Sequence, residues 1–168
     1  MYSIWVEVRD SGLVYNSDST VVLTEFGTVI ARTSAMLHAD GTAKVTLPGS
    51  INGKSYYIAI FHQSAIQTWS ANPIVFGATN TYDFSDNPAK AFGGNEVLTS
   101  SGAYAFFSGD INQDQNIDLS DYPSWDSDNF NFVFGYYSTD LNGDVNIDLS
   151  DFPFWDGNNT NFIFSNHP

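Results

Sequence analysis

Two acidic segments near the end of the chain carry the residues best suited to chemistry. Residues 110–121 read DINQDQNIDLSD and residues 140–151 read DLNGDVNIDLSD. Calcium prefers about six to eight oxygen ligands, and a calcium loop supplies them from its first, third, fifth, seventh, ninth and twelfth positions. All these positions are Asp or Asn in both segments: Asp110, Asn112, Asp114, Asn116, Asp118 and Asp121, then Asp140, Asn142, Asp144, Asn146, Asp148 and Asp151. The spacing predicts two calcium ions, one in each loop.

The two loops belong to a longer internal repeat. Residues 110–134 align with residues 140–164 at an offset of 30, and 16 of the 25 aligned positions are identical. A solvated turn is the alternative interpretation, because Asp and Asn favour turns without any metal. Two copies in register favour calcium over that alternative. A donor set made only of oxygen, without His or Cys, excludes zinc and disfavours softer transition metals.

The distribution of charge divides the chain into two regions. Residues 1–107 hold eight acidic and five basic residues, whereas residues 108–168 hold eleven acidic residues and no Lys or Arg. The total of −14 argues against nucleic acid and against an anionic membrane surface as partners. Because all the basic residues precede residue 108, we expect a domain boundary near Ser108. Repulsion among the loop carboxylates predicts that the second region is loosely folded without metal.

The first region has the pattern of a mainly-β domain. Short segments rich in β-branched and aromatic residues occur at 2–9, 28–34, 42–47, 55–62 and 81–84, separated by Gly, Pro and Asn turn signals. In the first of them Ile4, Val6 and Val8 alternate with more polar neighbours. Residues 1–107 are thus predicted to form an antiparallel β-sandwich.

Details of the loops lead to further expectations. The sixth loop position is normally Gly, but here it is Gln115 or Val145, so we expect the strained turn to move to the Asn that follows. Ile117 and Ile147, at the eighth position, are expected to pair the two loops back to back. Pro123 and Pro153 follow the loops and predict short exit helices, because Pro fits only the first helical turn. The twelfth position is Asp rather than the Glu of EF-hands, and this shorter side chain would reach the ion differently.

The two loop sequences resemble the paired loops of type I dockerins, which have a calcium loop and an exit helix but no entering helix. The wider sequence, from SYYIAIFHQSAIQTWSANPIVF through TYDF to DGNNTNFI, is similar to a module near the C-termini of large secreted and surface proteins of Bacteroidetes. In that group a β-sandwich precedes a dockerin-like calcium pair. The resemblance implies a small dockerin-like α domain over residues 108–168 and an extracellular or cell-surface location. It does not imply a cellulosome.

The resemblance also identifies a candidate partner surface. In dockerins the tenth and eleventh loop positions help to contact a cohesin; here they are Leu119 and Ser120, then Leu149 and Ser150. The repeated pair would permit binding in two orientations. The alternative, which we favour, is that Leu packs in the core and Ser caps the exit helix.

Aromatic residues offer a third possibility, carbohydrate binding. Trp125 and Trp155 occupy equivalent positions in the repeat, and we expect them to face each other in a shared core rather than to bind sugars. Tyr56, Phe61 and Trp69 would form a sugar-binding platform only if they were exposed together. Asp18-Ser19-Thr20 resembles a short bacterial O-glycosylation signal.

No pattern of catalytic residues accompanies these features. The three His residues form no recognisable constellation, there is no Cys, and the clustered carboxylates are assigned to calcium. The chain starts without the features of a signal peptide and holds no apolar run of about 20 residues, so we expect a piece of a larger protein with no membrane insertion. We predict a non-catalytic, calcium-binding structural or adhesive module that could be part of an extracellular assembly or filament. A docking module for a cohesin-like partner and a carbohydrate-binding module are the alternatives.

Overall fold

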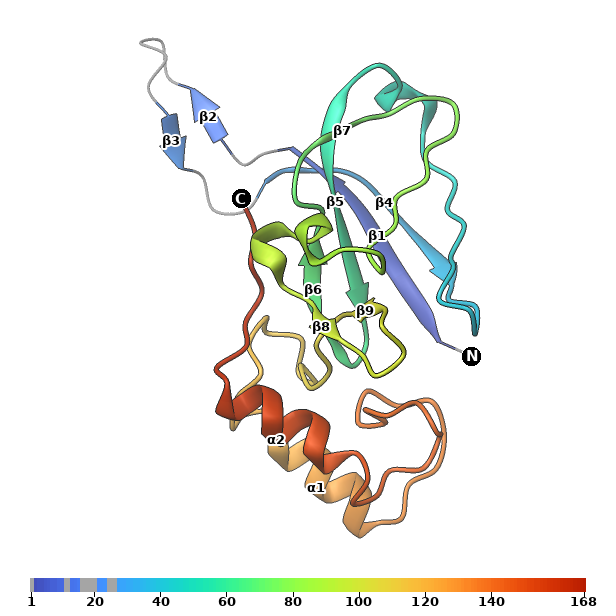
Figure 1. Ribbon diagram of the computed structural model, residues 1–168, viewed down its shortest axis with the longest axis vertical. Helices are drawn as coiled ribbons and strands as arrows, with labels where there is room; N and C mark the ends of the chain where they lie inside the picture. The colour runs from blue at the N-terminus through green and yellow to red at the C-terminus, as the bar shows by residue number, and fades with distance from the viewer. Residues whose placement is uncertain (1, 11–12, 16–20, 24–26) are drawn as a thin grey trace.

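A computed structural model of the protein describes residues 2–10, 13–15, 21–23 and 27–168 (Figure 1). The candidate glycosylation triplet Asp18-Ser19-Thr20 lies outside the described residues. Within the described residues, neither helix has the length and apolar character needed to cross a lipid bilayer.

An antiparallel sheet forms the centre of the first region (Figure 1). Its strands follow the order β4-β1-β5-β6, and a short strand β7 pairs with β5. The bounds are β1 Ser3–Arg9, β4 Val29–Met36, β5 Ser55–His62, β6 Ala65–Trp69 and β7 Ile74–Val75. Elsewhere β2 Leu13–Tyr15 pairs with β3 Val21–Leu23, and β8 Val97–Leu98 pairs with β9 Tyr104–Ala105, both antiparallel. Three 3-10 turns cover Gly49–Ile51, Pro88–Lys90 and Phe92–Gly94.

The mainly-β, antiparallel character of the first region is confirmed. Strands expected at 2–9, 28–34 and 55–62 are present, and the period-two pattern places Ile4, Val6 and Val8 in the core. The segments 42–47 and 81–84 are not strands. Their apolar residues, such as Val45 and Phe84, pack on the sheet without joining its hydrogen-bond ladder. A complete β-sandwich stays a prediction.

Two helices follow the loops, as expected, and both are short. Helix α1 spans Tyr122–Phe130 and helix α2 spans Phe152–Thr160, nine residues each. Pro123 and Pro153 lie in the first turn of each helix, where no backbone N–H is needed. The helices lie side by side at one end of the molecule, and the last residues of the chain run back along the sheet (Figure 1).

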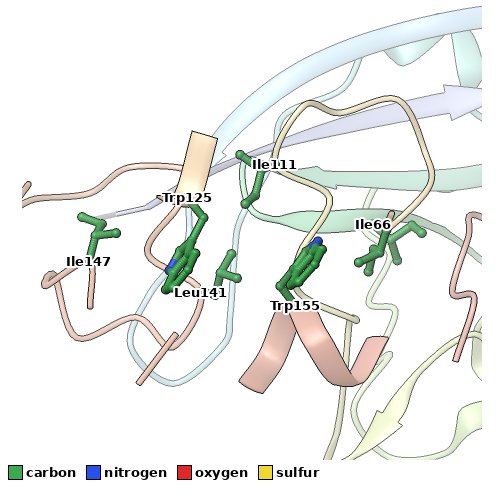
Figure 2. Close-up of a cluster of buried hydrophobic side chains, with 7 residues drawn as sticks. Ile66, Ile111, Trp125, Leu141, Ile147 and Trp155 are labelled. Atoms are coloured by element: carbon green, nitrogen blue, oxygen red, sulfur yellow. The ribbon is translucent and has the colours of Figure 1, made fainter. Parts of the chain in front are cut away.

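One hydrophobic cluster joins the sheet to the helices. It contains Ile66 of β6 together with residues of both repeats, namely Ile111, Ile117, Trp125, Leu141, Ile147 and Trp155 (Figure 2). Backbone bonds reinforce the contact: Gly109 N–H donates to Ser64 at 2.7 Å and Ile66 N–H donates to Phe107 at 2.9 Å. The two regions thus share buried contacts, and their division into domains of residues 1–107 and 108–168 stays a prediction.

The expectation that both repeat tryptophans are buried is confirmed, with one correction. Trp125 and Trp155 are 3 % and 5 % exposed. Each ring packs most closely on the residue that opens the other helix: Trp155 lies 5.2 Å from Tyr122, and Trp125 lies 5.2 Å from Phe152, between ring centroids. The core is therefore an exchange of aromatic rings between the two repeats rather than a direct tryptophan pair.

Candidate metal centre

The twelfth residue of each loop holds the loop closed. The carboxylate of Asp121 is fully buried and accepts three backbone N–H bonds, from Ile111 at 2.7 Å, Asn112 at 3.0 Å and Asp118 at 3.0 Å. The second loop repeats these bonds, with Asp151 accepting from Leu141, Asn142 and Asp148 at 2.8, 3.0 and 2.9 Å. The shorter Asp at this position therefore suffices to gather the loop backbone around it.

The first residue of each loop is buried in the same way. Asp110 is 1 % exposed and accepts from the N–H groups of Asp114 at 3.1 Å and Gln115 at 3.2 Å. Asp140 is also 1 % exposed and accepts from Gly143 at 2.9 Å and Val145 at 3.0 Å. Each loop thus has a buried carboxylate at both ends.

The remaining ligand positions lie nearer the surface. Asn112 donates to Asp114 at 3.0 Å and to the hydroxyl of Ser120 at 2.7 Å, and Asp118 accepts from Ser120 N–H at 2.7 Å. Among the described residues, no three His, Cys, Asp or Glu side chains are gathered as a metal site would gather them. The carboxylates of Asp114 and Asp118 are exposed at the rim of the first loop.

For three of the buried loop carboxylates, Asp110, Asp121 and Asp151, burial disfavours the ionised form and raises the pKa. Burial, together with repulsion from Asp121 and Asp114, raises the pKa of Asp110 to about 7. Burial also raises the pKa of Asp121 and of Asp151 above their ordinary values. Residues 108–168 contain no Lys or Arg to offset this charge. The donor set, made of carboxylate and amide oxygens without a basic partner, fits a hard divalent cation.

The prediction that the strained left-handed turn moves from the sixth loop position to the following Asn is wrong. Gln115 has φ 77° and Val145 has φ 68°, whereas Asn116 and Asn146 are not among the residues with positive φ. The reason lies in the hydrogen bonds, because the N–H of the sixth residue must point at the first carboxylate of the loop. The loop therefore keeps the left-handed turn at this position despite its side chain, even the β-branched Val145.

The expected back-to-back pairing of Ile117 and Ile147 is also wrong. Each loop pairs with the segment that follows the helix of the other repeat: Ile117 N–H donates to Ile163 at 2.9 Å, and Ile147 N–H donates to Val133 at 3.2 Å. Both isoleucine side chains nevertheless fill the shared core. The two repeats are thus interlocked, with each one completing the backbone hydrogen bonds of the other.

The structure also corrects the favoured interpretation of the tenth and eleventh positions. Leu119 and Leu149 are each 73 % exposed and do not pack in the core. Ser120 and Ser150 accept from Asn112 and Asn142 within their loops, at 2.7 Å in each case, and neither helix has a side-chain cap. The leucine and serine pairs are therefore available at the surface.

The sugar-binding platform considered for Tyr56, Phe61 and Trp69 is not formed. Trp69 is 1 % exposed and packs against Tyr57 and His167, so it cannot join an exposed row with Tyr56 and Phe61. The sequence did not reveal this, because the strand that holds Trp69 is buried on both of its faces.

Comparisons with protein-family models, with curated proteins and with solved structures find no match to this chain. The site is therefore interpreted from its own geometry.

A buried carboxyl outside the loops was not identified from the sequence. Glu96 is 7 % exposed, and neither of its carboxylate oxygens has a hydrogen-bond partner among the described residues. Burial, with repulsion from Asp86 and Asp83, raises its pKa from 4.5 to about 7. Ionisation of Glu96 therefore opposes folding.

This burial predicts a pH-dependent gain from Glu96→Gln. The native state holds the proton more tightly than the unfolded chain, so wild-type stability falls as the pH rises from about 4.5 to about 7. We expect the substitution to raise the free energy of unfolding by about 2 kcal/mol at pH 8 and by little at pH 4.5. Urea unfolding at both pH values, with Asp156→Asn as an exposed control, measures the difference. An equal effect at both pH values would show that ionisation is not the cause.

Proposed function

We propose that residues 108–168 bind two calcium ions, one in each loop, and that the chain is a non-catalytic structural or adhesive module. The observation that carries the proposal is the set of four carboxylates that are at most 1 % exposed, in a region without a basic residue: Asp110, Asp121, Asp140 and Asp151. Buried charges are costly unless they are paired or coordinate a metal. A divalent cation in each loop would remove that cost.

The ligand assignment follows the loop spacing. In the first loop the ion would be held by Asp110, Asn112, Asp114 and Asp121, with Asp118 and the backbone carbonyl of Asn116 completing the set. The second loop would use the same positions at an offset of 30 residues. By attracting the exposed carboxylates to the buried ones, calcium would stiffen both loops and the core that they share with β6.

The wider role rests on the resemblance to dockerin-like pairs that follow β-sandwiches. We infer a β-sandwich over residues 1–107, a dockerin-like calcium-binding domain over residues 108–168, and an extracellular or cell-surface setting. Calcium is plentiful there, and a stiff, protease-resistant module suits an adhesin or a filament subunit. The strongly acidic second region is consistent with this role and disfavours nucleic acid as a partner.

A docking module remains the second candidate because of one observation. Leu119 and Leu149 are exposed to the same extent, at equivalent positions of the repeat. A receptor of the cohesin type would then contact these residues together with Ser120 and Ser150. Replacing both serines with Arg would abolish such binding while leaving the calcium stoichiometry at two.

Calcium titration tests the main proposal. After chelation, calorimetry is expected to show two sites per chain, while light scattering on the same sample reports whether the mass changes. An unchanged mass would favour a monomeric module, and growth in mass would favour an assembly. Absence of binding at millimolar calcium would refute the assignment and leave only a duplicated acidic turn.

A further inference from the structure

Four of the exposed phenylalanines of the second region occupy equivalent positions of the repeat. Phe132 and Phe162 are 90 % and 83 % exposed, and Phe134 and Phe164 are 69 % and 55 % exposed. They form two pairs at equivalent positions of the repeat, here named the first Phe patch (Phe132 and Phe134) and the second Phe patch (Phe162 and Phe164). The two phenylalanines of each pair lie two residues apart in the sequence, and large exposed apolar patches mark interaction sites.

The first residue of each patch has an unusual backbone. Phe132 has φ 52° and Phe162 has φ 53°, in the left-handed region that normally requires Gly. Both terminate a helix in the same manner: Val133 N–H donates to Asp128 at 3.0 Å, and Ile163 N–H donates to Asn158 at 3.1 Å. The turn places Val133 and Ile163 against the core and leaves the phenylalanines in solvent. A Gly would serve this turn better, so the side chain is not explained by folding.

Each patch lies beside the acidic loop of the other repeat. The backbone of Phe164 forms an isolated antiparallel β-bridge with Asn116, and that of Phe134 forms one with Asn146. A hollow in the surface at the second patch is lined by residues of both segments, namely Asn116, Ile117, Asp118, Phe162, Ile163 and Phe164. The second patch thus has the Asp118 carboxylate beside its exposed rings, and Asp148 occupies the equivalent loop position for the first patch.

The chemistry of the patches selects the kind of partner. Phenylalanine has no polar group with which to bind the hydroxyls of a sugar. The region carries eleven acidic and no basic residues, and two bound calcium ions would still leave it at −7. This charge repels an anionic membrane and a second acidic region of the same chain. A basic protein surface is the complementary partner.

We propose that the two Phe patches are docking sites for a protein that presents apolar pockets rimmed by Lys or Arg. The phenylalanines fill the pockets, and the loop carboxylates pair with the basic rim. This surface is distinct from the leucine and serine positions of the two loops. It is present in duplicate, so one chain can engage two equivalent binding elements.

Selection of peptides on the full chain tests the proposal. A displayed library of random peptides is selected on the wild type in millimolar calcium and counter-selected on the double variant Phe132→Gly, Phe162→Gly. The variant is expected to fold, because Gly suits a positive φ; its circular dichroism spectrum and its calcium stoichiometry by calorimetry check this independently. Trp5→Ser, an exposed aromatic of the sheet that is 45 % exposed, is the control.

The proposal expects enriched peptides that combine Lys or Arg with Leu, Ile or Phe. They should bind the double variant at least ten times more weakly than the wild type or Trp5→Ser, and more weakly as salt rises. Enriched peptides without basic residues, or equal binding to the double variant, would overturn it. The proposal would also be overturned if the wild type bound a glycan or neutral vesicles instead of peptides, and if the double variant lost that binding. Because calorimetry reports calcium separately, failure here is distinguishable from failure of the calcium assignment.

Discussion

Asp121→Ala is expected to remove one calcium site and to destabilise the second region by about 4 kcal/mol. The Asp121 carboxylate is fully buried and accepts bonds from the N–H groups of Ile111, Asn112 and Asp118. Alanine would leave these backbone donors without partners, and it would also delete the last ligand of the loop. Urea unfolding and calcium calorimetry on the same samples measure both effects.

Two further variants separate the roles of Asp121. Asp121→Asn keeps the shape and part of the hydrogen bonding but removes the charge; since burial already raises the pKa of Asp121, the loss of stability in chelator should be small. Its calcium stoichiometry should still fall from two to one. Asp156→Asn, an exposed acid of α2, should behave as the wild type. Two intact calcium sites in Asp121→Ala would contradict the ligand assignment.

Trp155→Ala is expected to cost about 3–5 kcal/mol, as large-to-small substitutions of a buried aromatic do. Trp155 is 5 % exposed, its ring lies against Tyr122 and Phe152, and its indole N–H donates to the carbonyl of Asp118 at 3.0 Å. The substitution therefore opens a cavity and releases the backbone of the first loop. We expect the midpoint of thermal unfolding to fall by about 10 °C or more.

A tryptophan-to-alanine substitution on the sheet provides the matched control. Trp5→Ala removes a tryptophan that is 45 % exposed and lies over Arg32, so its effect should be below about 1 kcal/mol. Trp155→Phe should be intermediate, because it keeps most of the ring and loses the bond to Asp118. Near-ultraviolet circular dichroism follows the unfolding. Equal effects of the two alanine variants would contradict the shared core as the main support of the second region.

Features governed by neighbours in the chain were predictable from the sequence. The calcium-loop spacing, the short helices after Pro123 and Pro153, and the alternation of Ile4, Val6 and Val8 all depend on residues a few positions apart. Loop turns, helix starts and strand faces each follow such short periods. These predictions concern local geometry, and the structure agrees with the helices and with the buried face of β1.

Features that depend on burial could not be predicted in the same way. Trp69 was expected to lie in a strand, but the bounds of strand β6 could not be predicted, because all five of its residues are buried and it shows no alternation. Segments 42–47 and 81–84 alternate like strands, yet they cover the sheet instead of joining it. Glu96 has no sequence signal, since an acidic residue in a segment without periodicity gives no indication that it is buried.

The duplicated acidic loops, and with them the prediction of a hard cation rather than zinc, come from the sequence alone, because ligand type and spacing are local properties. The tertiary structure decided which residues are buried in the core and which are exposed to solvent. It paired each loop with the opposite repeat, joined Tyr2 to Asp140, and turned Val133 and Ile163 inward so that Phe132 and Phe162 point outward. These outcomes follow from contacts between segments far apart in the chain, where an apolar residue carries the same sequence signal whether it becomes buried or remains exposed.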